Sequence, residues 1–296
     1  MIKTFREIFY SSIRSVFYNF KFVLLLWGAN FFAAFIVSMP IYYIINDNLG
    51  NSAIGEFVSD EFSIFWLNQF RFIYESNLSG IPLVLISTLL AYMLIQSFFV
   101  GGIISIFNQT AKNHSVDFFY GSVKYWYRFT KVMFISLFFF AVAFLFNDLL
   151  GNLITYIFLN TENELLDMSL RSLRYIILIF LIGIVTIISD YARVSIVIGD
   201  KNKIFKEIYN TLIFIKNNFK LTFNVFFLVA VIGAFGSLIY NLISGTIPRS
   251  PFYMLIISLI VQQLLIIFRF LVRMLFFATE VYIFKDLNSD IIEVEV

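Results

Sequence analysis

The sequence predicts an all-α, polytopic membrane protein with six transmembrane helices, cytoplasmic amphipathic elbow helices and a pseudo-threefold internal repeat. Three observations lead to this prediction: the composition, the spacing of the apolar windows and the distribution of charge. Of the 296 residues, 60% are hydrophobic and only 14% are charged, and the mean hydropathy is +0.88. Soluble globular chains are about half apolar and about a quarter charged, so this composition is typical of a chain that crosses lipid.

Apolar windows of about 20 residues, the length that crosses roughly 30 Å of hydrocarbon, recur along the chain. They lie near residues 22–45, 81–107, 129–147, 174–198, 219–243 and 252–284. The first window is too long for a signal peptide and is followed by no small-residue cleavage site. We therefore expect it to be retained as a transmembrane span.

The charged residues between these windows alternate in sign. Lys and Arg dominate the first segment and the second-to-third and fourth-to-fifth connections: Lys3, Arg6, Arg14, Lys21, Lys112, Lys124, Arg128, Lys131, Lys201, Lys203, Lys206, Lys216 and Lys220. Asp and Glu dominate the other two connections: Asp47, Glu56, Asp60, Glu61, Glu75, Asp148, Glu162, Glu164 and Asp167. Because Lys and Arg mark short cytoplasmic loops, we expect both termini to be cytoplasmic.

The first acidic connection contains "DEFSIFWLNQFRFIYES", residues 60–76, with apolar side chains at helical spacing. This pattern predicts an amphipathic helix in the outer membrane interface. Such a helix would be an ordered cap on the bundle or, alternatively, a recognition surface.

Three basic segments resemble one another and begin at Phe5, Val116 and Phe205. Each carries an early acid, then aromatic residues interleaved with Lys or Arg. A shift of 90 residues also pairs Asp117 with Glu207, and Ser105 with Ser195. We infer one domain, residues 1–288, whose unit is an elbow helix and two spans, repeated over about 1–108, 109–200 and 201–288. Repeats of equal topology are related by an axis along the membrane normal. The tail, 289–296, is short and acidic.

The elbow helices are expected to lie in the cytoplasmic interface, with Lys and Arg toward anionic lipid headgroups and Phe and Tyr toward acyl chains. Small residues in the spans are placed for close helix contact. They are Ala29, Ala33, Gly101, Gly102, Ser105, Ala230, Gly233, Ala234 and Ser237.

The sixth window carries a polar stripe of Gln262, Arg269, Arg273 and Glu280. Their separations of seven, four and seven residues place them within about 40° on one helix face. A charge on a spanning helix is costly unless it meets protein, water or a partner, or reaches an interface along its own side chain. Snorkelling to the cytoplasmic surface is one interpretation for the two arginines, but it does not explain Gln262 or Glu280.

Asp190 and Arg193 stand three residues apart near the end of the fourth window, a spacing that lets an acid and a base on one helix pair. One interpretation is a locally neutralised pair that ends the span. The other is the polar floor of a cytoplasm-facing cavity, shared with Glu280. The second repeat has Val100 and Ile103 at the matching positions, so the repeat itself does not require these charges.

Catalytic chemistry has little support in the sequence. There are no cysteines and a single histidine, His114, which leaves no thiolate site and too few ligands for a typical catalytic zinc. No Walker loop, GxSxG, HExxH or two-metal carboxylate cluster is present. We therefore expect a protein that is not an enzyme, with no cofactor, metal or nucleic-acid partner.

Two stretches, "FFVGGIISIFNQTAKNHSVDFFYGSVKYWYRF" and "SDYARVSIVIGDKNKIFKEIYNTLIFIKNN", run from a span through a polar turn into an aromatic, Lys-rich elbow. This pattern resembles a loose group of prokaryotic six-helix membrane proteins of unknown function. The group is related to the membrane domain fused to some glycerophosphodiester phosphodiesterases. The resemblance implies the inner membrane of a prokaryote and transfers no activity.

The sequence leaves two main functions open. The polar stripe, together with the absence of catalytic motifs, favours a non-enzymatic accessory or scaffold subunit of a bacterial envelope complex. Such a subunit would bind protein partners or form a homo-oligomer. The alternative is a small transporter or lipid-handling protein with a cytoplasm-facing vestibule lined by Asp190, Arg193, Arg269, Arg273 and Glu280. An intramembrane enzyme is third. A stripe that faces inward would favour the vestibule, and one that faces outward would favour a partner.

Overall fold

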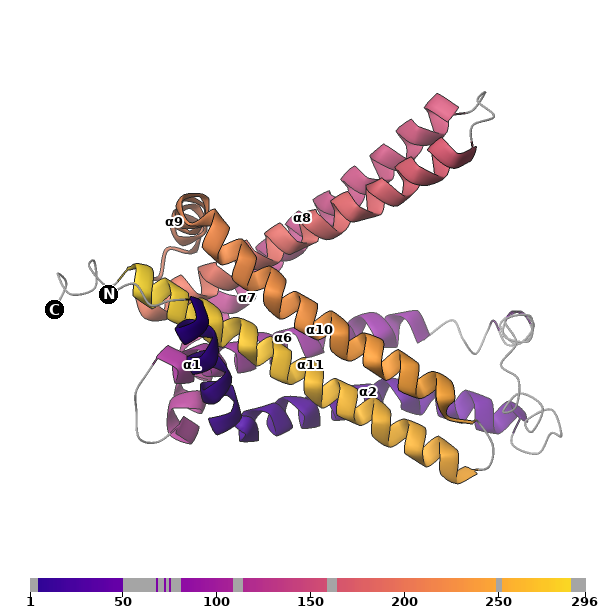
Figure 1. The fold of residues 1–296 in the computed structure, drawn as a ribbon. Coiled ribbons are helices and arrows are strands. Elements are labelled where there is room, and N and C mark those ends of the chain that lie inside the picture. Colours follow the sequence, from indigo (N-terminus) through magenta and orange to yellow (C-terminus); the bar gives the residue numbers. More distant parts are fainter. Residues whose placement is uncertain are drawn as a thin grey trace. The chain divides into compact units, whose positions relative to one another are not determined.

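The computed structural model describes residues 5–49, 81–108, 114–158, 164–248 and 252–288, together with positions 68, 72 and 75. This part of the chain is helical (Figure 1). Its helices are α1 (Phe5–Tyr18), α2 (Phe20–Leu49), α6 (Ile81–Asn108), α7 (His114–Phe158), α8 (Glu164–Ile198), α9 (Ile204–Asn217), α10 (Phe219–Thr246) and α11 (Phe252–Leu287). Most of the segment 60–76 and the tail 289–296 lie outside the described residues, so the predicted interfacial helix there stays a prediction.

Six of these helices, α2, α6, α7, α8, α10 and α11, are long and apolar enough to cross a membrane. They coincide with the six predicted windows, and the all-α, polytopic class is therefore confirmed. The remaining two, α1 and α9, are the expected short amphipathic helices ahead of the first and fifth spans. Each is 14 residues long.

The elbow ahead of the third span differs from the other two. Helix α1 is separated from α2 at Asn19, and α9 from α10 at Asn218, but α7 runs without a break through 45 residues. At about 1.5 Å per residue α7 is roughly 67 Å long. The second elbow is therefore continuous with its span.

Local sequence explains this difference. Both breaks fall at Asn-Phe-Lys, whereas a shift of 90 residues places Arg128 where the third elbow has Asn218. The Asn218 side-chain amide donates to the Phe214 carbonyl, and the backbone carbonyl of Asn218 accepts from the Thr222 N–H at 3.1 Å. Asparagine forms such local bonds and favours helix ends, whereas arginine is a good helix former. The threefold repeat itself remains a prediction.

The chain divides into two compact units, each described by itself. Unit 1 comprises residues 1–15, 97–227 and 276–296, and unit 2 comprises residues 16–96 and 228–275. Unit 1 contains α1 up to Ser15, all of α7, α8 and α9, the end of α6, the start of α10 and the end of α11. We call the ends of α6, α8 and α11, together with α1, α9 and the starts of α7 and α10, the elbow end of unit 1.

The core of unit 1 joins segments that are far apart in the sequence. Its buried members come from α1, α8, α9, α10 and α11: Ile8, Ile187, Tyr191, Ile215, Val225 and Ile283. Phe214 of α9 packs against this core in tilted ring contacts, with its ring centroid 5.6 Å from that of Tyr191 and 4.9 Å from that of Phe284. Apolar burial and aromatic contact together hold the short helices α1 and α9 against the ends of the spans.

Helices α6 and α7 approach closely within unit 1 through small residues. A Cβ added at Gly102 would lie 2.7 Å from the Phe118 carbonyl oxygen, and one at Gly101 would lie 3.0 Å from the Gly121 carbonyl oxygen. Neither position leaves room for a side chain. The small residues of the second span are therefore packing residues, as predicted.

Helices α7 and α8 form an antiparallel hairpin in unit 1 (Figure 1). Near its tip the Arg174 guanidinium lies over Gly151, where any Cβ would collide with it. The same guanidinium donates to the Tyr175 hydroxyl at 2.8 Å. Glycine thus makes space on α7 for an arginine of α8.

Candidate functional site

The polar side chains of the elbow end are the strongest candidates for a site. Arg193 Nη1 donates to Asp190 Oδ1 at 2.7 Å on α8, and the two side chains are 12% and 1% exposed. The spacing of three residues brings them to one face of the helix, as expected. Tyr191 and Ala192, between them in the chain, are fully buried, so this turn of α8 packs against protein on more than one side.

Glu280 of α11 belongs to the same unit. It is 3% exposed and therefore buried, like Tyr191 next to Asp190 on α8. Thr279 beside it is also buried and donates to the Phe276 carbonyl. Two buried carboxylates and one guanidinium therefore lie in unit 1, carried by α8 and α11.

A third buried acid, Glu207 of α9, is absent from the predicted set of site residues. Its carboxylate accepts from the Ser195 hydroxyl at 2.8 Å and from Asn210 Nδ2 at 3.2 Å, and Lys201 Nζ lies 3.5 Å away. The repeat contained a signal for this contact, because Ser195 and Glu207 recur as Ser105 and Asp117 at the same spacing. A charged residue on an amphipathic helix is usually exposed, so the pattern provided no reason to expect Glu207 to be buried. Its burial follows from the packing of α9 on α8.

The turn between α8 and α9 is held to α7 by charge. Asp200 lies 2.8 Å from Lys124 Nζ and 2.8 Å from Arg128 Nη1, and Arg128 also donates to the Lys201 carbonyl. Asp200 has φ of 43°, in the left-handed region that usually takes glycine at a helix end. The Lys201 N–H donates to the Ile196 carbonyl at 3.2 Å, which is the 6→1 bond of a Schellman motif.

This ion cluster shifts the titration of Asp200. Hydrogen bonds from Lys124 and then Arg128 lower the pKa of the Asp200 carboxyl from its ordinary value of 3.8. About half of its side chain is exposed, so solvent weakens the interaction. The cluster fixes the α8–α9 turn and shows no sign of a binding site. At the end of α11, Lys285 similarly donates to the Asn108 carbonyl, the last residue of α6.

The predicted stripe on α11 does not share one environment. Gln262 and Arg269 are exposed, Arg273 is partly exposed and Glu280 is buried. The first three belong to unit 2, whereas Glu280 belongs to unit 1. Of the predicted site residues, unit 1 therefore holds Asp190, Arg193 and Glu280, and the ion pair joins the first two.

Within unit 2, hydrogen bonds between neutral side chains link α2 to α11 and α2 to α6. Trp27 Nε1 donates to Gln263 Oε1 at 2.9 Å and links α2 to α11. The Tyr92 hydroxyl of α6 donates to Asn30 Oδ1 at 3.1 Å and accepts from Gln96 at 2.7 Å. Asn30 and Gln263 therefore bond between helices, whereas Gln96 bonds Tyr92 within α6.

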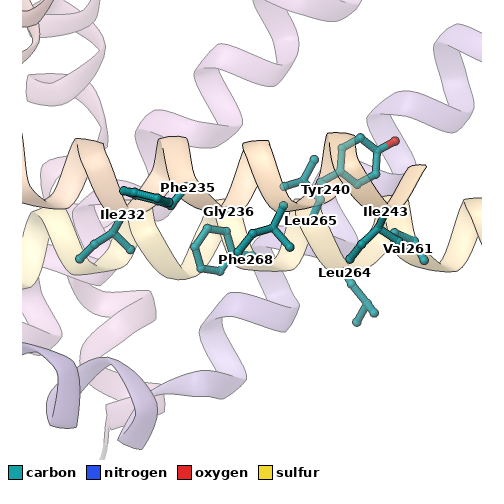
Figure 2. A pocket seen from close by; sticks show the side chains of 10 residues that line it. Ile232, Phe235, Gly236, Tyr240, Ile243, Val261, Leu264, Leu265 and Phe268 are labelled. Carbon is teal, nitrogen blue, oxygen red and sulfur yellow. The ribbon is translucent and has the colours of Figure 1, made fainter. Parts of the chain in front are cut away.

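The residues that the structure describes line grooves and cavities in both units. The groove between α10 and α11 of unit 2 has a volume of about 610 Å³ and is apolar (Figure 2). Phe268 lies against Gly236 there. A groove of about 450 Å³ lies between α2 and α6. In unit 1, an apolar cavity of about 130 Å³ lies among α7, α8 and α9, and a basic groove of about 730 Å³ lies beside it. None of these four is lined by Asp190, Arg193 or Glu280.

Among the residues the structure describes, no group of three or more His, Asp or Glu could hold a metal ion. Comparison of the chain with protein-family models, with curated proteins and with solved structures gave no match.

Proposed function

We propose that this integral membrane protein is a non-enzymatic accessory or scaffold subunit, which binds a partner through the exposed polar face of α11. The observation that carries the proposal is the position of Arg269. It is an exposed cation on a helix long and apolar enough to span the membrane.

The packing of α11 on α10 shows at which level along the helix pair Arg269 lies. Phe268 lies against Gly236, and Val272 lies 3.4 Å from the place of a Cβ on Gly233. The two helices are therefore antiparallel, and Arg269 is level with Phe235. At 1.5 Å per residue this level is roughly 24 Å from the start of α10 and roughly 16 Å from its end.

An arginine at that depth is costly on a lipid-facing surface unless its charge is matched. One helical turn is 5.4 Å, so either end of α10 is about three turns or more away from Arg269. A partner helix with a carboxylate or amide acceptor at the same depth would remove the cost. Gln262, also exposed and two turns from Arg269 on the same face, would add a second hydrogen bond to such a partner.

The experiment is affinity purification of the full chain from its native membrane in mild detergent, compared with Arg269→Leu. We expect the parent to retain a stoichiometric membrane partner and Arg269→Leu to lose it while remaining monodisperse. Arg14→Leu is the control, since it removes an exposed cation from α1 and leaves α11 intact. The proposal fails if the parent is a monodisperse monomer, or if Arg269→Leu and Arg14→Leu retain the partner equally.

The alternative is a small transporter or lipid-handling protein. The observation that favours it is the burial of Asp190 and Glu280 in one unit with Arg193, because ionisable groups inside membrane helices commonly mark substrate or proton pathways. The double variant Asp190→Asn with Arg193→Gln tests it in reconstituted vesicles. A substrate or proton flux lost in that variant, with the fold retained, would favour transport over the scaffold.

A further inference from the structure

The basic groove of unit 1 brings together residues from two separate basic segments. Its volume is about 730 Å³, and we call it the lysine groove. It is lined by Lys131, Phe134 and Ile135 of α7, by Asn202 and Lys203 of the α8–α9 connection, and by Ile204, Phe205 and Lys206 of α9.

The groove carries an excess of positive charge. Lys131, Lys203 and Lys206 are exposed, and no acid is among the lining residues. The nearest acids along the chain have other partners: Asp200 binds Lys124 and Arg128, and Glu207 binds Ser195 and Asn210. Lys131 is placed by the Tyr127 ring, with Nζ 4.2 Å from the ring centroid. An anion would complement this charge.

The walls of the groove are apolar. Phe134 and Phe205 are exposed, and Phe138 continues the exposed apolar face of α7 one turn beyond Phe134. Ile135 lines both this groove and the apolar cavity among α7, α8 and α9. From the lysines outward along α7, the surface therefore changes from cationic to hydrocarbon-like within one or two helical turns, as it would for a ligand with a charged head and an apolar chain.

The first turn of α9 adds to the positive potential. Lys203 is its N-cap and provides no side-chain hydrogen bond to the helix. The first N–H groups of a helix have no partner within it, and they carry the positive end of the helix dipole. These groups strengthen an anion site whose main charge comes from the three lysines.

We propose that the lysine groove is a specific site for an anionic phospholipid of the leaflet that meets the elbow end. The headgroup phosphate lies among Lys131, Lys203 and Lys206. An acyl chain follows Phe134 and Ile135 along α7. This site is distinct from the partner face of α11 and does not depend on it.

The test is lipid binding to the purified full chain, measured by native mass spectrometry during titration with phosphatidylglycerol or phosphatidylcholine. We expect phosphatidylglycerol to bind at one site and phosphatidylcholine to bind at least about tenfold more weakly. Each lysine near an anionic headgroup contributes roughly a factor of five. The triple variant Lys131→Gln, Lys203→Gln, Lys206→Gln should therefore weaken phosphatidylglycerol binding by about 100-fold.

The matched control is Lys21→Gln, Lys216→Gln, Lys220→Gln, which removes the same charge from outside the groove and should leave binding within about threefold of the parent. Ile135→Trp, which narrows the apolar wall and keeps the lysines, should also weaken binding. Equal loss in the two triple variants would overturn the proposal, since it would indicate general charge attraction. Full competition by millimolar inorganic phosphate would also overturn it, since an apolar chain would then be irrelevant.

Discussion

Unit 1 buries Asp190, Glu207 and Glu280, whereas contacts described in unit 2, such as the hydrogen bond from Trp27 to Gln263, join its helices through neutral side chains. The charges of unit 1 lie at the elbow end, where α1 and α9 pack on the ends of the spans and supply partners from several helices. Unit 2 comprises residues 16–96 and 228–275, which hold α2 and the remaining parts of α6, α10 and α11. Buried charge is tolerated where many elements converge, and neutral groups suffice where two helices meet.

The largest expected effect tests the buried charge of unit 1. Arg193→Ala deprives the Asp190 carboxylate of its guanidinium, and breaking a buried ion pair costs about 3–5 kcal/mol. We expect a large fall in thermal stability in detergent, followed by circular dichroism. The control is Asp190→Leu with Arg193→Leu, which removes both charges and should restore most of that stability. If Arg193→Ala were as stable as the parent, the ion pair of Asp190 and Arg193 would be unimportant to the fold.

The next effect compares glycines of the two units. In Gly102→Ala the new Cβ would lie 2.7 Å from the Phe118 carbonyl oxygen, whereas a Cβ at Gly28 of α2 meets nothing within 4 Å. We expect Gly102→Ala to destabilise unit 1 by about 1–3 kcal/mol. Gly28→Ala should be neutral or stabilising by up to about 1 kcal/mol, because alanine is the better helix former. The same stability measurement checks both, and effects of equal sign would contradict the difference in packing.

A smaller effect concerns the exposed ion cluster of Asp200. Its pKa is lower in the folded protein than the ordinary 3.8. The stability from this group is therefore complete above about pH 4 and lost as the pH falls through the folded pKa. Because Asp200 is half exposed, we expect less than about 1 kcal/mol.

Two substitutions separate the charge of Asp200 from its backbone conformation. Asp200→Asn should reduce the part of the acid dependence below about pH 4 that comes from this site. Asp200→Gly loses the same charge but relieves the positive φ, so it should be the more stable of the two variants. A pH profile of unfolding that is identical in the parent and in Asp200→Asn would exclude this role.

The smallest effect belongs to the neutral contacts of unit 2. Trp27→Phe removes the donor to Gln263 and retains an aromatic ring. Hydrogen bonds between membrane helices contribute about 0.6 kcal/mol on average, so we expect a loss of that order in the unfolding measurement. A loss comparable to that of Arg193→Ala would mean that unit 2 depends on polar contacts as strongly as unit 1 does.

The six spans were predictable because each depends on a local property, a run of about 20 apolar residues. The windows near 81–107 and 219–243 agree closely with α6 and α10. The uninterrupted α7 was not predicted, since the apolar window near 129–147 gives no information on the polar turn before it. Replacement of asparagine by Arg128 at the expected break is the local signal that could have indicated it.

The candidate site was predictable only in part. The spacing of Asp190 and Arg193 permits an ion pair on any helix, and the structure contains that pair. The stripe from Gln262 to Glu280 was correct as a helix face, but its two ends differ in exposure. Helical periodicity gives the direction in which a side chain points around the helix axis. It does not show which neighbouring helix or solvent the side chain meets at each level.

The amino-acid sequence alone determined the class of this protein, its spans and the alternation of charge between its connections, because hydropathy and helix periodicity act within one segment. Only the tertiary structure decided which charges are buried and which basic segments meet. Glu207 is buried because α9 packs against α8, and Lys131 faces Lys203 and Lys206 because α7 lies beside the start of α9. These relations depend on contacts between helices, 12 positions apart for Ser195 and Glu207 and about 70 apart for Lys131 and Lys203, and no pattern within one helix encodes them.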